Sequence, residues 1–290
     1  MHGLGNDFMV IDLVSQSLDG NPIEAMQQWL SARKIQQLAD RHFGIGFDQL
    51  LIVEPPSSPL NDFCYRIFNA DGAEVENCGN GARCFAIFVQ QQGLTRKNNI
   101  LVETLGGLLE LQVLPNNQVQ VSMGEPNLSP ESLPFLTEHS QPQATPQWQL
   151  RLPSPLDQPI TFTAVSMGNP HAVVHVDNLD STDVEQIGQL IQQHPAFPSS
   201  VNVGFMQIIN RQEIRLRVYE RGCGETLACG TGACAAVVAG QLNQLLDNTV
   251  TVSLRGGFLT ICHDMQSGHQ SVLMTGPAET VYHGTISTNK

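Results

Sequence analysis

The stretch ENCGNGARC at residues 76–84 indicates an internal repeat, because it has a near twin, LACGTGACA, at residues 227–235. In both copies a cysteine directly precedes a glycine, a polar residue, a second glycine and an alanine. An offset of 151 residues places Cys78 on Cys229. A set of such special residues that recurs at one offset predicts a structural repeat.

The likeness between the two segments extends upstream of both cysteines. The same offset of 151 aligns further pairs: Arg66 with Arg217, Ile67 with Val218, Phe68 with Tyr219 and Glu74 with Glu225. Two more blocks recur in the same order, at offsets of 158 and 163: GFDQLLI (46–52) with GFMQIIN (204–210), and LGNDFMVID (4–12) with MGNPHAVVH (167–175). We therefore expect two related halves.

Each half contains the same kinds of predicted element. Short apolar runs bounded by Gly, Asn, Asp or Pro predict strands at 9–14, 49–54, 64–70, 171–176, 205–210 and 214–220. The small and apolar stretches 81–93 and 232–246, after the Cys-Gly turns, have the length of buried helices. The amphipathic segments 22–42 and 181–195 predict one more helix per half, the second opening at a Ser/Thr/Asp cap. The expected class is α+β, with one apolar helix per half among strands.

A proline-rich stretch separates the halves. Residues 124–159 hold eight of the 17 prolines and few periodic segments. This composition predicts an interdomain crossing followed by loops or edge strands.

Composition and charge exclude several classes of function. The 290 residues suffice for two cores of common domain size, and the net charge of −13 disfavours nucleic acid or an anionic membrane surface as a partner. No apolar run approaches the ~18 residues of a membrane span. The N-terminus MHGLGNDFMV lacks a basic leader, and the odd number of seven cysteines favours free thiols in a reducing compartment. We expect a cytoplasmic protein.

The paired cysteines have a setting that suits acid–base chemistry. A cysteine just before a helix lies near unpaired backbone N–H groups and the positive end of the helix dipole, which favours the thiolate. The following glycines let a substrate carboxylate approach the same N–H groups. If the halves face each other, Cys78 and Cys229 would flank one molecule. One thiolate would remove a proton from a carbon stereocentre while the other thiol supplies one to the opposite face.

Other uses of the cysteines have less support. A single cysteine before a helix is more often a small buried hydrophobe, and only the duplication argues against that interpretation here. The sequence has no CxxC pair and its nine histidines are scattered, so no metal site is expected. The only lysines are Lys34, Lys97 and Lys290, none beside a glycine-rich turn, so no pyridoxal cofactor and no other cofactor is expected.

Five motifs together resemble the diaminopimelate epimerase family: HGLGNDF, NADGAEVENCGNGARC, GNPHAV, NVGF and ERGCGETLACGTGAC. The resemblance spans nearly the whole chain. It implies interconversion of LL- and meso-2,6-diaminopimelate in lysine and peptidoglycan precursor biosynthesis, without a cofactor, by a homodimer. It also implies two pseudo-symmetric domains, 1–124 plus about 276–290 and 125–275. Each would be a mostly antiparallel β-barrel wrapped around a central helix.

The family's functional residues carry over to matching positions. Cys78 and Cys229 match the catalytic cysteines, the first acting as base towards the LL isomer and the second towards the meso isomer. His171 and Glu220 match residues that adjust the pKa of the cysteines. Substrate-binding roles fall on Asn6, Gln49, Asn69, Asn169 and Asn202, on the backbone donors Gly79, Asn80, Gly230 and Thr231, and on Glu220 and Arg221. The last two would hold the distal ammonium and carboxylate, for which an Arg fork and an adjacent carboxylate are suited.

Without the resemblance, plainer interpretations of these residues stay open. Asn6 and Asn169 stand beside glycines and are typical turn formers, and His171 lies among apolar residues as a core histidine would. Glu220 and Arg221 would also suit a solvated strand end. Glu74 and Glu225 are expected to orient the cysteine loops by hydrogen bonds, and packing roles are expected for Cys64, Cys84, Cys223, Cys234 and Cys262.

Two other functions fit part of the pattern. A thiol redox protein would use the same two cysteines to form a reversible disulfide. A racemase of a smaller amino acid would share the two-base chemistry. Arg221 and Glu220 argue against the racemase, because they would have no distal head to bind.

Overall fold

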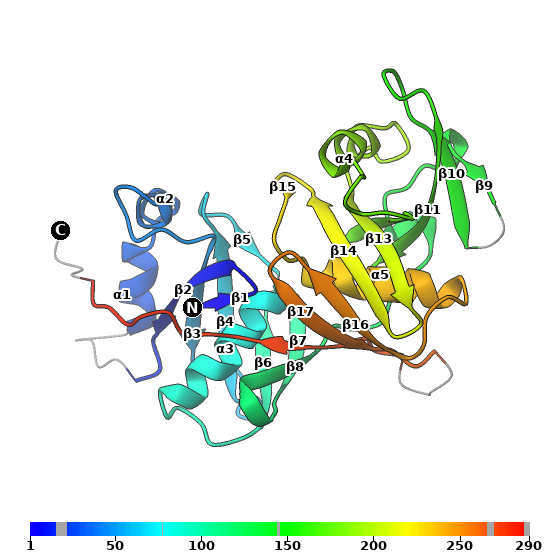
Figure 1. Ribbon diagram of the computed structural model, residues 1–290. Coiled ribbons are helices and arrows are strands. Elements are labelled where there is room, and N and C mark those ends of the chain that lie inside the picture. The colour runs from blue at the N-terminus through cyan, green and yellow to red at the C-terminus, as the bar shows by residue number, and fades with distance from the viewer. Residues whose placement is uncertain (16–21, 77, 144–145, 266–269, 287–290) are drawn as a thin grey trace. The chain divides into compact units, whose positions relative to one another are not determined.

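The computed structural model describes residues 1–15, 22–76, 78–143, 146–265 and 270–286. The chain forms two compact units (Figure 1). The first unit comprises Met1–Ser122 and Thr275–Lys290, and the second comprises Met123–Met274.

Strands of the first unit surround one apolar helix. Its elements are β1 (His2–Gly3), β2 (Asn6–Asp12), α1 (Pro22–Trp29), α2 (Ala32–Ala39), β3 (Gln49–Glu54), β4 (Phe63–Asn69), β5 (Glu74–Val75), α3 (Gly79–Gln91), β6 (Asn99–Thr104), β7 (Gly107–Val113), a 3₁₀ turn at Pro115–Asn117 and β8 (Gln118–Ser122). Pairing is antiparallel for β1–β2, β3–β4, β4–β5, β6–β7 and β7–β8, and parallel for β2–β3 and β4–β6. The chain's last strand, β18 (Leu273–Pro277), pairs with β8.

Helix α3 is the centre of the first unit's core. It packs against β1, β2, β3, β7 and β8, and its residues from Gly79 to Val89 are buried on all sides. Gly81 allows this close packing, because a Cβ there would lie 3.2 Å from Cε1 of Phe8 and 3.3 Å from Cδ1 of Ile67. The run of small and apolar residues after Cys78 therefore specifies a helix that strands can enclose.

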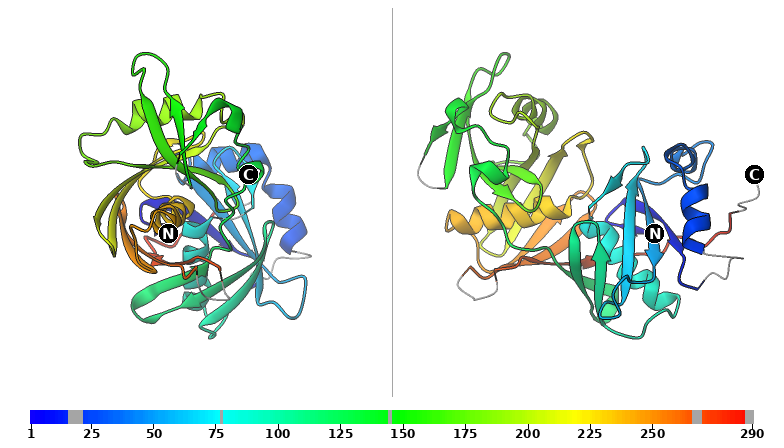
Figure 2. Two further views of the ribbon diagram at one scale, coloured as in Figure 1. Left: turned by 90° about the vertical axis from the view of Figure 1, so that its right-hand side faces the viewer. Right: turned by 180° about the vertical axis from the view of Figure 1, so that it is seen from behind.

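The second unit repeats this plan around α5. Its elements are two 3₁₀ turns (Pro130–Ser132 and Thr137–His139), β9 (Gln141–Pro142), β10 (Gln147–Arg151), β11 (Pro159–Ser166), β12 (Pro170–His175), α4 (Val184–Gln192), β13 (Asn202–Asn210), β14 (Glu213–Glu220), β15 (Gly224–Glu225), α5 (Gly230–Leu242), β16 (Thr249–Leu254) and β17 (Gly257–Cys262). Parallel pairs again occur at β12–β13 and β14–β16 among otherwise antiparallel neighbours. Helix α5 contacts β11, β12, β13, β14 and β17, and Figure 2 shows it against the curved strands of its own unit.

The repeat predicted from the sequence is present in the structure, and the α+β class with an enclosed helix in each half is confirmed. The two central helices begin at Gly79 and Gly230 and correspond at the offset of 151. One predicted correspondence is wrong. Phe8 pairs with Gln49 as His171 pairs with Asn202, so Gln49 corresponds to Asn202, and GFDQLLI does not correspond to GFMQIIN. Apolar strand residues are interchangeable, so their likeness set the wrong register.

Two predicted elements differ from the structure. The helix expected over 22–42 is two helices, because Ser31 ends the first and caps α2 by accepting a hydrogen bond from the Lys34 N–H at 3.2 Å. The stretch 124–159 is more than a crossing with loops. Leu133 and Phe135 are buried in the second unit's core, where Phe135 stacks on Phe197 with ring centroids 5.2 Å apart.

Candidate active site

In the first unit, Cys78 stands at the N-terminus of α3. Its backbone is extended (φ −147°, ψ 118°), and its side chain makes no capping hydrogen bond to the helix. The Cys78 N–H donates to the hydroxyl of Tyr65 at 3.3 Å, and the half-buried Sγ lies 3.8 Å from Oδ1 of Asn6. The turn between β1 and β2 brings Asn6 here, with Leu4 and Gly5 in the left-handed region at φ 58° and 88°.

A buried arginine fixes the first turn of α3. Arg83 is 0 % exposed and donates to the carbonyl of Gly79 at 3.2 Å, to Oδ1 of Asn80 at 3.0 Å and to the carbonyl of Pro277 at 3.1 Å. Asn80 in turn donates from Nδ2 to Oδ1 of Asn6 at 3.3 Å. The backbone and amides around Cys78 are therefore held in one arrangement.

Gln49 and Asn69 form a second polar group in the first unit. They face each other across β3 and β4, and Nε2 of Gln49 donates to Oδ1 of Asn69 at 2.8 Å. Gln49 also pairs with Phe8 on β2, the strand that begins at Asn6. The predicted binding amides of this unit thus lie on adjoining strand ends.

In the second unit, Cys229 occupies the equivalent place before α5. It is only 4 % exposed, and its Sγ lies 3.6 Å from Oγ1 of Thr231. Burial raises the pKa of Cys229 well above its usual value, and the carboxylate of Glu220 raises it further. The position before a helix favours the thiolate, whereas burial and Glu220 favour the thiol at Cys229.

Glu220 is coupled directly to this thiol. Burial also raises the pKa of Glu220, while hydrogen bonds from the Thr226 hydroxyl and from Cys229 oppose the rise. A thiol and a carboxyl group with raised pKa values in contact can share one proton. This finding removes the alternative in which Glu220 is a solvated strand end.

His171 is connected to the same loop through Asn169. Its Nε2 lies 3.1 Å from Oδ1 of Asn169, whose Nδ2 donates to the hydroxyl of Thr231 at 3.3 Å. The ring is fully buried, and among the described residues its Nδ1 has no hydrogen-bond partner. Burial, helped by the charge of Arg221, lowers the pKa of His171 to about 3, so the imidazole is neutral at physiological pH.

Asn202 and Arg221 complete the polar group of the second unit. The Arg221 N–H donates to Oδ1 of Asn202 at 2.9 Å, and Asn202 donates from Nδ2 to the carbonyl of Pro170 at 3.1 Å. The guanidinium of Arg221 is exposed, and its Nη1 donates to the carbonyl of Ser199 at 3.3 Å.

The glutamates four residues before each cysteine form matching ion pairs. Arg66 binds Glu74 through two hydrogen bonds of 2.7 and 2.8 Å, and Arg217 binds Glu225 through two of 2.7 Å. Each pair joins the short strand before the cysteine to its neighbour, β4 or β14. The hydrogen bonds expected for these glutamates are present, and their role in orienting the loops stays a prediction.

Several residues that shape the two loops were not predicted from the sequence. Tyr65 contacts Cys78, and Thr226 contacts Glu220. Asp48 accepts a hydrogen bond from Nδ2 of Asn6 at 3.1 Å. One of the missed residues had a readable signal. Arg83 is a charged residue inside an otherwise apolar helical stretch and stands three positions after Asn80, the spacing that places side chains on one helix face.

The other cysteines differ among themselves. Cys84 and Cys234 are 0 % exposed within the central helices, as packing residues should be. The packing role expected for Cys223 is wrong, because this residue is exposed in the turn between β14 and β15. Cys64 and Cys262 are half-buried.

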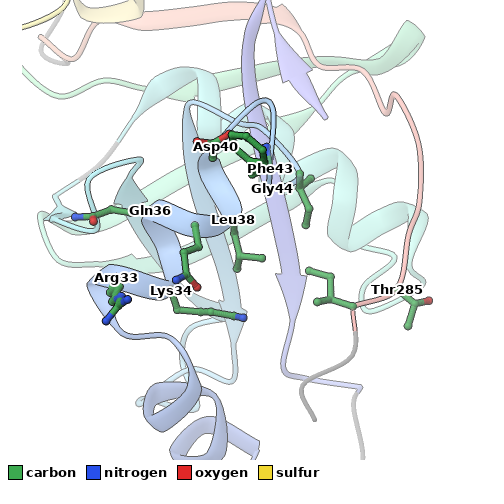
Figure 3. A pocket seen from close by; sticks show the side chains of 11 residues that line it. Arg33, Lys34, Gln36, Leu38, Asp40, Phe43, Gly44 and Thr285 are labelled. Carbon is green, nitrogen blue, oxygen red and sulfur yellow. The ribbon is translucent and has the colours of Figure 1, made fainter. Parts of the chain in front are cut away.

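A pocket of about 820 Å³ lies in the first unit (Figure 3). It is lined by α2, the turn after it and the segment at Thr285 and Ile286. None of the predicted site residues lines this pocket. Over the described part of the chain, no helix is both long and apolar enough to cross a membrane. Within the same ranges, no three His, Cys, Asp or Glu side chains gather as metal ligands would.

Comparison with known proteins finds close relatives over nearly the full length. A family model described as diaminopimelate epimerase matches residues 1–129 and 163–281. The chain is 55 % identical to a diaminopimelate epimerase of Teredinibacter turnerae, over 99 % of this chain and 97 % of the relative. It is 54 % identical to one of Thioalkalivibrio sulfidiphilus over the same shares.

Solved structures share the fold at low sequence identity. A probable proline racemase from Agrobacterium radiobacter superposes with a TM-score of 0.64 at 17 % identity, covering 99 % of this chain and 91 % of that one. A hydroxyproline epimerase from Agrobacterium vitis gives a TM-score of 0.63 at 16 % identity, covering 95 % and 87 %. These similarities establish the architecture of the chain.

Proposed function

The chain belongs to the diaminopimelate epimerase family. We propose that it interconverts LL- and meso-2,6-diaminopimelate, with two cysteines that each exchange a proton with the substrate's α-carbon. In this proposal Cys78 and Cys229 reach opposite faces of one α-carbon. The thiolate of one takes the α-proton and becomes a thiol, while the thiol of the other gives its proton to the opposite face and becomes a thiolate. No electrons are transferred, so the reaction needs no redox partner.

One observation carries the proposal. Each unit places a cysteine at the first turn of its central helix, in corresponding positions and with extended backbone. Each cysteine also has an amide from the corresponding upstream turn nearby: Asn6 contacts Cys78 and Asn80, and Asn169 contacts Thr231. A packing cysteine would not need this polar environment twice.

The different surroundings of the two sulfurs support a division of roles. Burial and Glu220 favour the neutral thiol at Cys229, so this residue is suited to donate the proton when Cys78 acts as base towards the LL isomer. Glu220 is hydrogen bonded to the Cys229 sulfur. It is placed to accept the thiol proton of Cys229, so that Cys229 can act as base when the reaction runs from the meso isomer. His171 stays neutral and acts through Asn169 on the loop.

Substrate binding is assigned to the amides and backbone donors already described. Gly79, Asn80, Gly230 and Thr231 supply N–H groups at the helix N-termini, which suit the reacting carboxylate. The remaining assignments are Asn6, Gln49, Asn69, Asn169 and Asn202 for the substrate's polar groups, and Glu220 with Arg221 for its distal ammonium and carboxylate. The exposed guanidinium of Arg221 leaves its fork available to a carboxylate.

The test is an exchange assay without added cofactor. Purified protein, dialysed against chelator in a reducing buffer, is incubated in D₂O with LL-diaminopimelate, and in parallel with lysine and with proline. We expect the meso isomer to form with deuterium at the inverted carbon and the other two amino acids to stay unchanged. Racemisation of lysine or proline at a comparable rate would instead support a general amino-acid racemase, and no exchange at any substrate would remove the proposal.

The same family membership supports the wider setting that we infer. The enzyme would act as a cytoplasmic homodimer without a cofactor, in lysine and peptidoglycan precursor biosynthesis, with functional domains at 1–124 plus about 276–290 and at 125–275. Size-exclusion chromatography with light scattering tests the dimer, which should elute with twice the mass of one chain. A particle with the mass of one chain at micromolar concentration would contradict it.

A further inference from the structure

Three charged residues, Arg41, Asp7 and Asp48, form an ion-pair cluster next to Asn6. Arg41 donates from both Nη atoms to the carboxylate of Asp7, at 2.8 and 2.9 Å, and from Nη2 to Oδ1 of Asp48 at 2.7 Å. The two aspartates also bind each other's backbone. The Asp7 N–H donates to Oδ2 of Asp48 at 3.0 Å, and the Asp48 N–H donates to Oδ1 of Asp7 at 2.7 Å. Asp48 is therefore held at several points even though it lies near the surface.

This arrangement determines which way the amide of Asn6 points. A carboxylate can only accept hydrogen bonds, so the 3.1 Å contact with Oδ2 of Asp48 must be made by Nδ2 of Asn6. The other end of the amide, Oδ1, then faces the loop, where it lies 3.8 Å from Sγ of Cys78 and 3.3 Å from Nδ2 of Asn80. Rotation of the amide by half a turn would place two donors against each other at Asn80.

The second unit orients its corresponding amide by a different residue. Its counterpart of Asp48 is the fully buried Val201, because Gln49 corresponds to Asn202. There His171, the counterpart of Phe8, binds Oδ1 of Asn169, so that Nδ2 faces Thr231. The repeated asparagines thus present opposite atoms to their cysteine loops, and a non-equivalent residue fixes each one.

We propose that Asp48, held by Arg41, is a positioning residue that fixes the amide of Asn6 with Oδ1 towards the sulfur of Cys78. Its chemical importance rests on the proposed function of Cys78. The geometry itself has a consequence that needs no catalysis. A carbonyl oxygen that faces the sulfur accepts a hydrogen bond from the thiol and repels the thiolate, so it opposes ionisation of Cys78 in the ligand-free enzyme. Because Asn6 is also assigned to bind the substrate, this opposition ends when the substrate takes up the amide and Cys78 acts as base. If the amide loses its anchor, it can turn Nδ2 towards the sulfur and favour the thiolate.

The test must change only one of the ionisable groups near Cys78. They are the phenol of Tyr65 on β4, the guanidinium of Arg83 and the thiol of Cys84 on α3, the amino group of Met1, and the carboxylates of Asp7 and Asp48. Asp48→Ala removes only the last of these. Asp40→Ala is the matched control, because it removes a carboxylate from the same surface segment and the Asp40 carboxylate accepts from the N–H groups of His42 and Phe43.

The readout is the rate of alkylation of Cys78 by iodoacetamide between pH 6 and pH 10, followed by peptide mass spectrometry. The exposed Cys223 in the same molecule serves as the internal reference. Asp48→Ala should shift the midpoint at Cys78 downward by about half a pH unit or more, with no shift at Cys223 and none at Cys78 in Asp40→Ala. An unchanged midpoint at Cys78 in Asp48→Ala would overturn the proposal.

A double substitution separates orientation from the loss of charge. Asn6→Ala alone should lower the midpoint, and adding Asp48→Ala should change it no further, because no amide remains to be oriented. An equal shift in both backgrounds would show that the charge of Asp48 acts by itself and would refute the positioning role. If Asp48→Ala does not fold, Arg41→Gln replaces it and should shift the midpoint in the same direction, whereas no shift there overturns the proposal. Because alkylation needs no turnover, failure of the exchange assay and failure of this proposal are separate results.

Discussion

We propose that substrate specificity depends on Arg221. Its backbone N–H is fixed by Asn202 at 2.9 Å, while its guanidinium extends to the carbonyl of Ser199. The neighbouring Glu220 is held by Thr226 and Cys229. The backbone at this strand end is thus rigid while a charged fork remains accessible, which is the arrangement that a second amino-acid head would require.

We expect Arg221→Lys to lower kcat/KM for diaminopimelate by at least tenfold. Lysine keeps the charge but loses the planar fork, so about 1.4 kcal/mol or more of transition-state binding should disappear. Steady-state kinetics in both directions measure the effect. The exposed Arg151→Lys is a control on a remote ion pair with Asp157, and it should leave kcat/KM unchanged. Equal kinetics for Arg221→Lys and the unsubstituted enzyme would remove the distal-site assignment.

Because His171 is buried, it makes the stability of the folded chain depend on pH. Its pKa falls from an ordinary value near 6.5 to about 3 in the folded chain. The unfolded chain therefore binds a proton that the folded chain does not, and stability is lost as the pH falls below about 6.5. In His171→Gln this part of the loss should be absent. Urea unfolding at pH 7.5 and pH 5 tests this, and an identical fall in unfolding free energy for both proteins would contradict it.

At the scale of elements, the loops before the two cysteines depend on matched ion pairs whose surroundings differ. Glu225 has a second cation, because Arg255 Nη1 lies 3.2 Å from its Oε1. Arg66 instead serves two carboxylates: Glu74 at 2.7 Å and the 8 % exposed Glu54 at 3.9 Å. Loss of Arg66 therefore leaves a buried carboxyl group without its nearest cation, while loss of Arg217 does not leave Glu225 alone.

We predict that Arg66→Met destabilises the protein more than Arg217→Met. Uncompensated burial of a charged group costs on the order of 1–3 kcal/mol, and a partly exposed pair with a remaining partner costs about 1 kcal/mol or less. Chemical denaturation of both variants under the same conditions gives the two changes in unfolding free energy. A larger loss in Arg217→Met would show that Arg255 does not substitute for Arg217.

Across the whole molecule, the sequence predicted best where residues of special chemistry repeat. The cysteines, glycines and the Arg–Glu pairs fixed the equivalence of α3 with α5 and of β4 with β14, because few other residues fit those positions. The prediction failed where apolar residues carried the signal, as in the sequence alignment of β3 with β13. It also failed where one polar side chain interrupted a periodic segment, as Ser31 does between α1 and α2.

The environment of individual site residues could not be predicted from local patterns. Burial of Cys229, exposure of Arg221 and the contact between Asp48 and Asn6 each depend on segments that are distant in the sequence. The direction of a thiol pKa follows from the balance between desolvation and the helix dipole, and desolvation depends on the complete fold. The sequence therefore predicted the location of Cys229 at a helix N-terminus but not the burial that raises its pKa.

We propose that Cys78 and Cys229 exchange protons with opposite faces of one α-carbon. Deuterium incorporation in variants that each lack one cysteine tests this most directly. LL- and meso-diaminopimelate are incubated in D₂O with the unsubstituted enzyme, Cys78→Ala, Cys229→Ala and the exposed-site control Cys223→Ala, all in reducing buffer. We predict that the unsubstituted enzyme and Cys223→Ala form the other isomer with deuterium at the inverted carbon, and that Cys78→Ala and Cys229→Ala fold but form none. Epimerisation by Cys78→Ala or Cys229→Ala at a rate near that of the unsubstituted enzyme would contradict it.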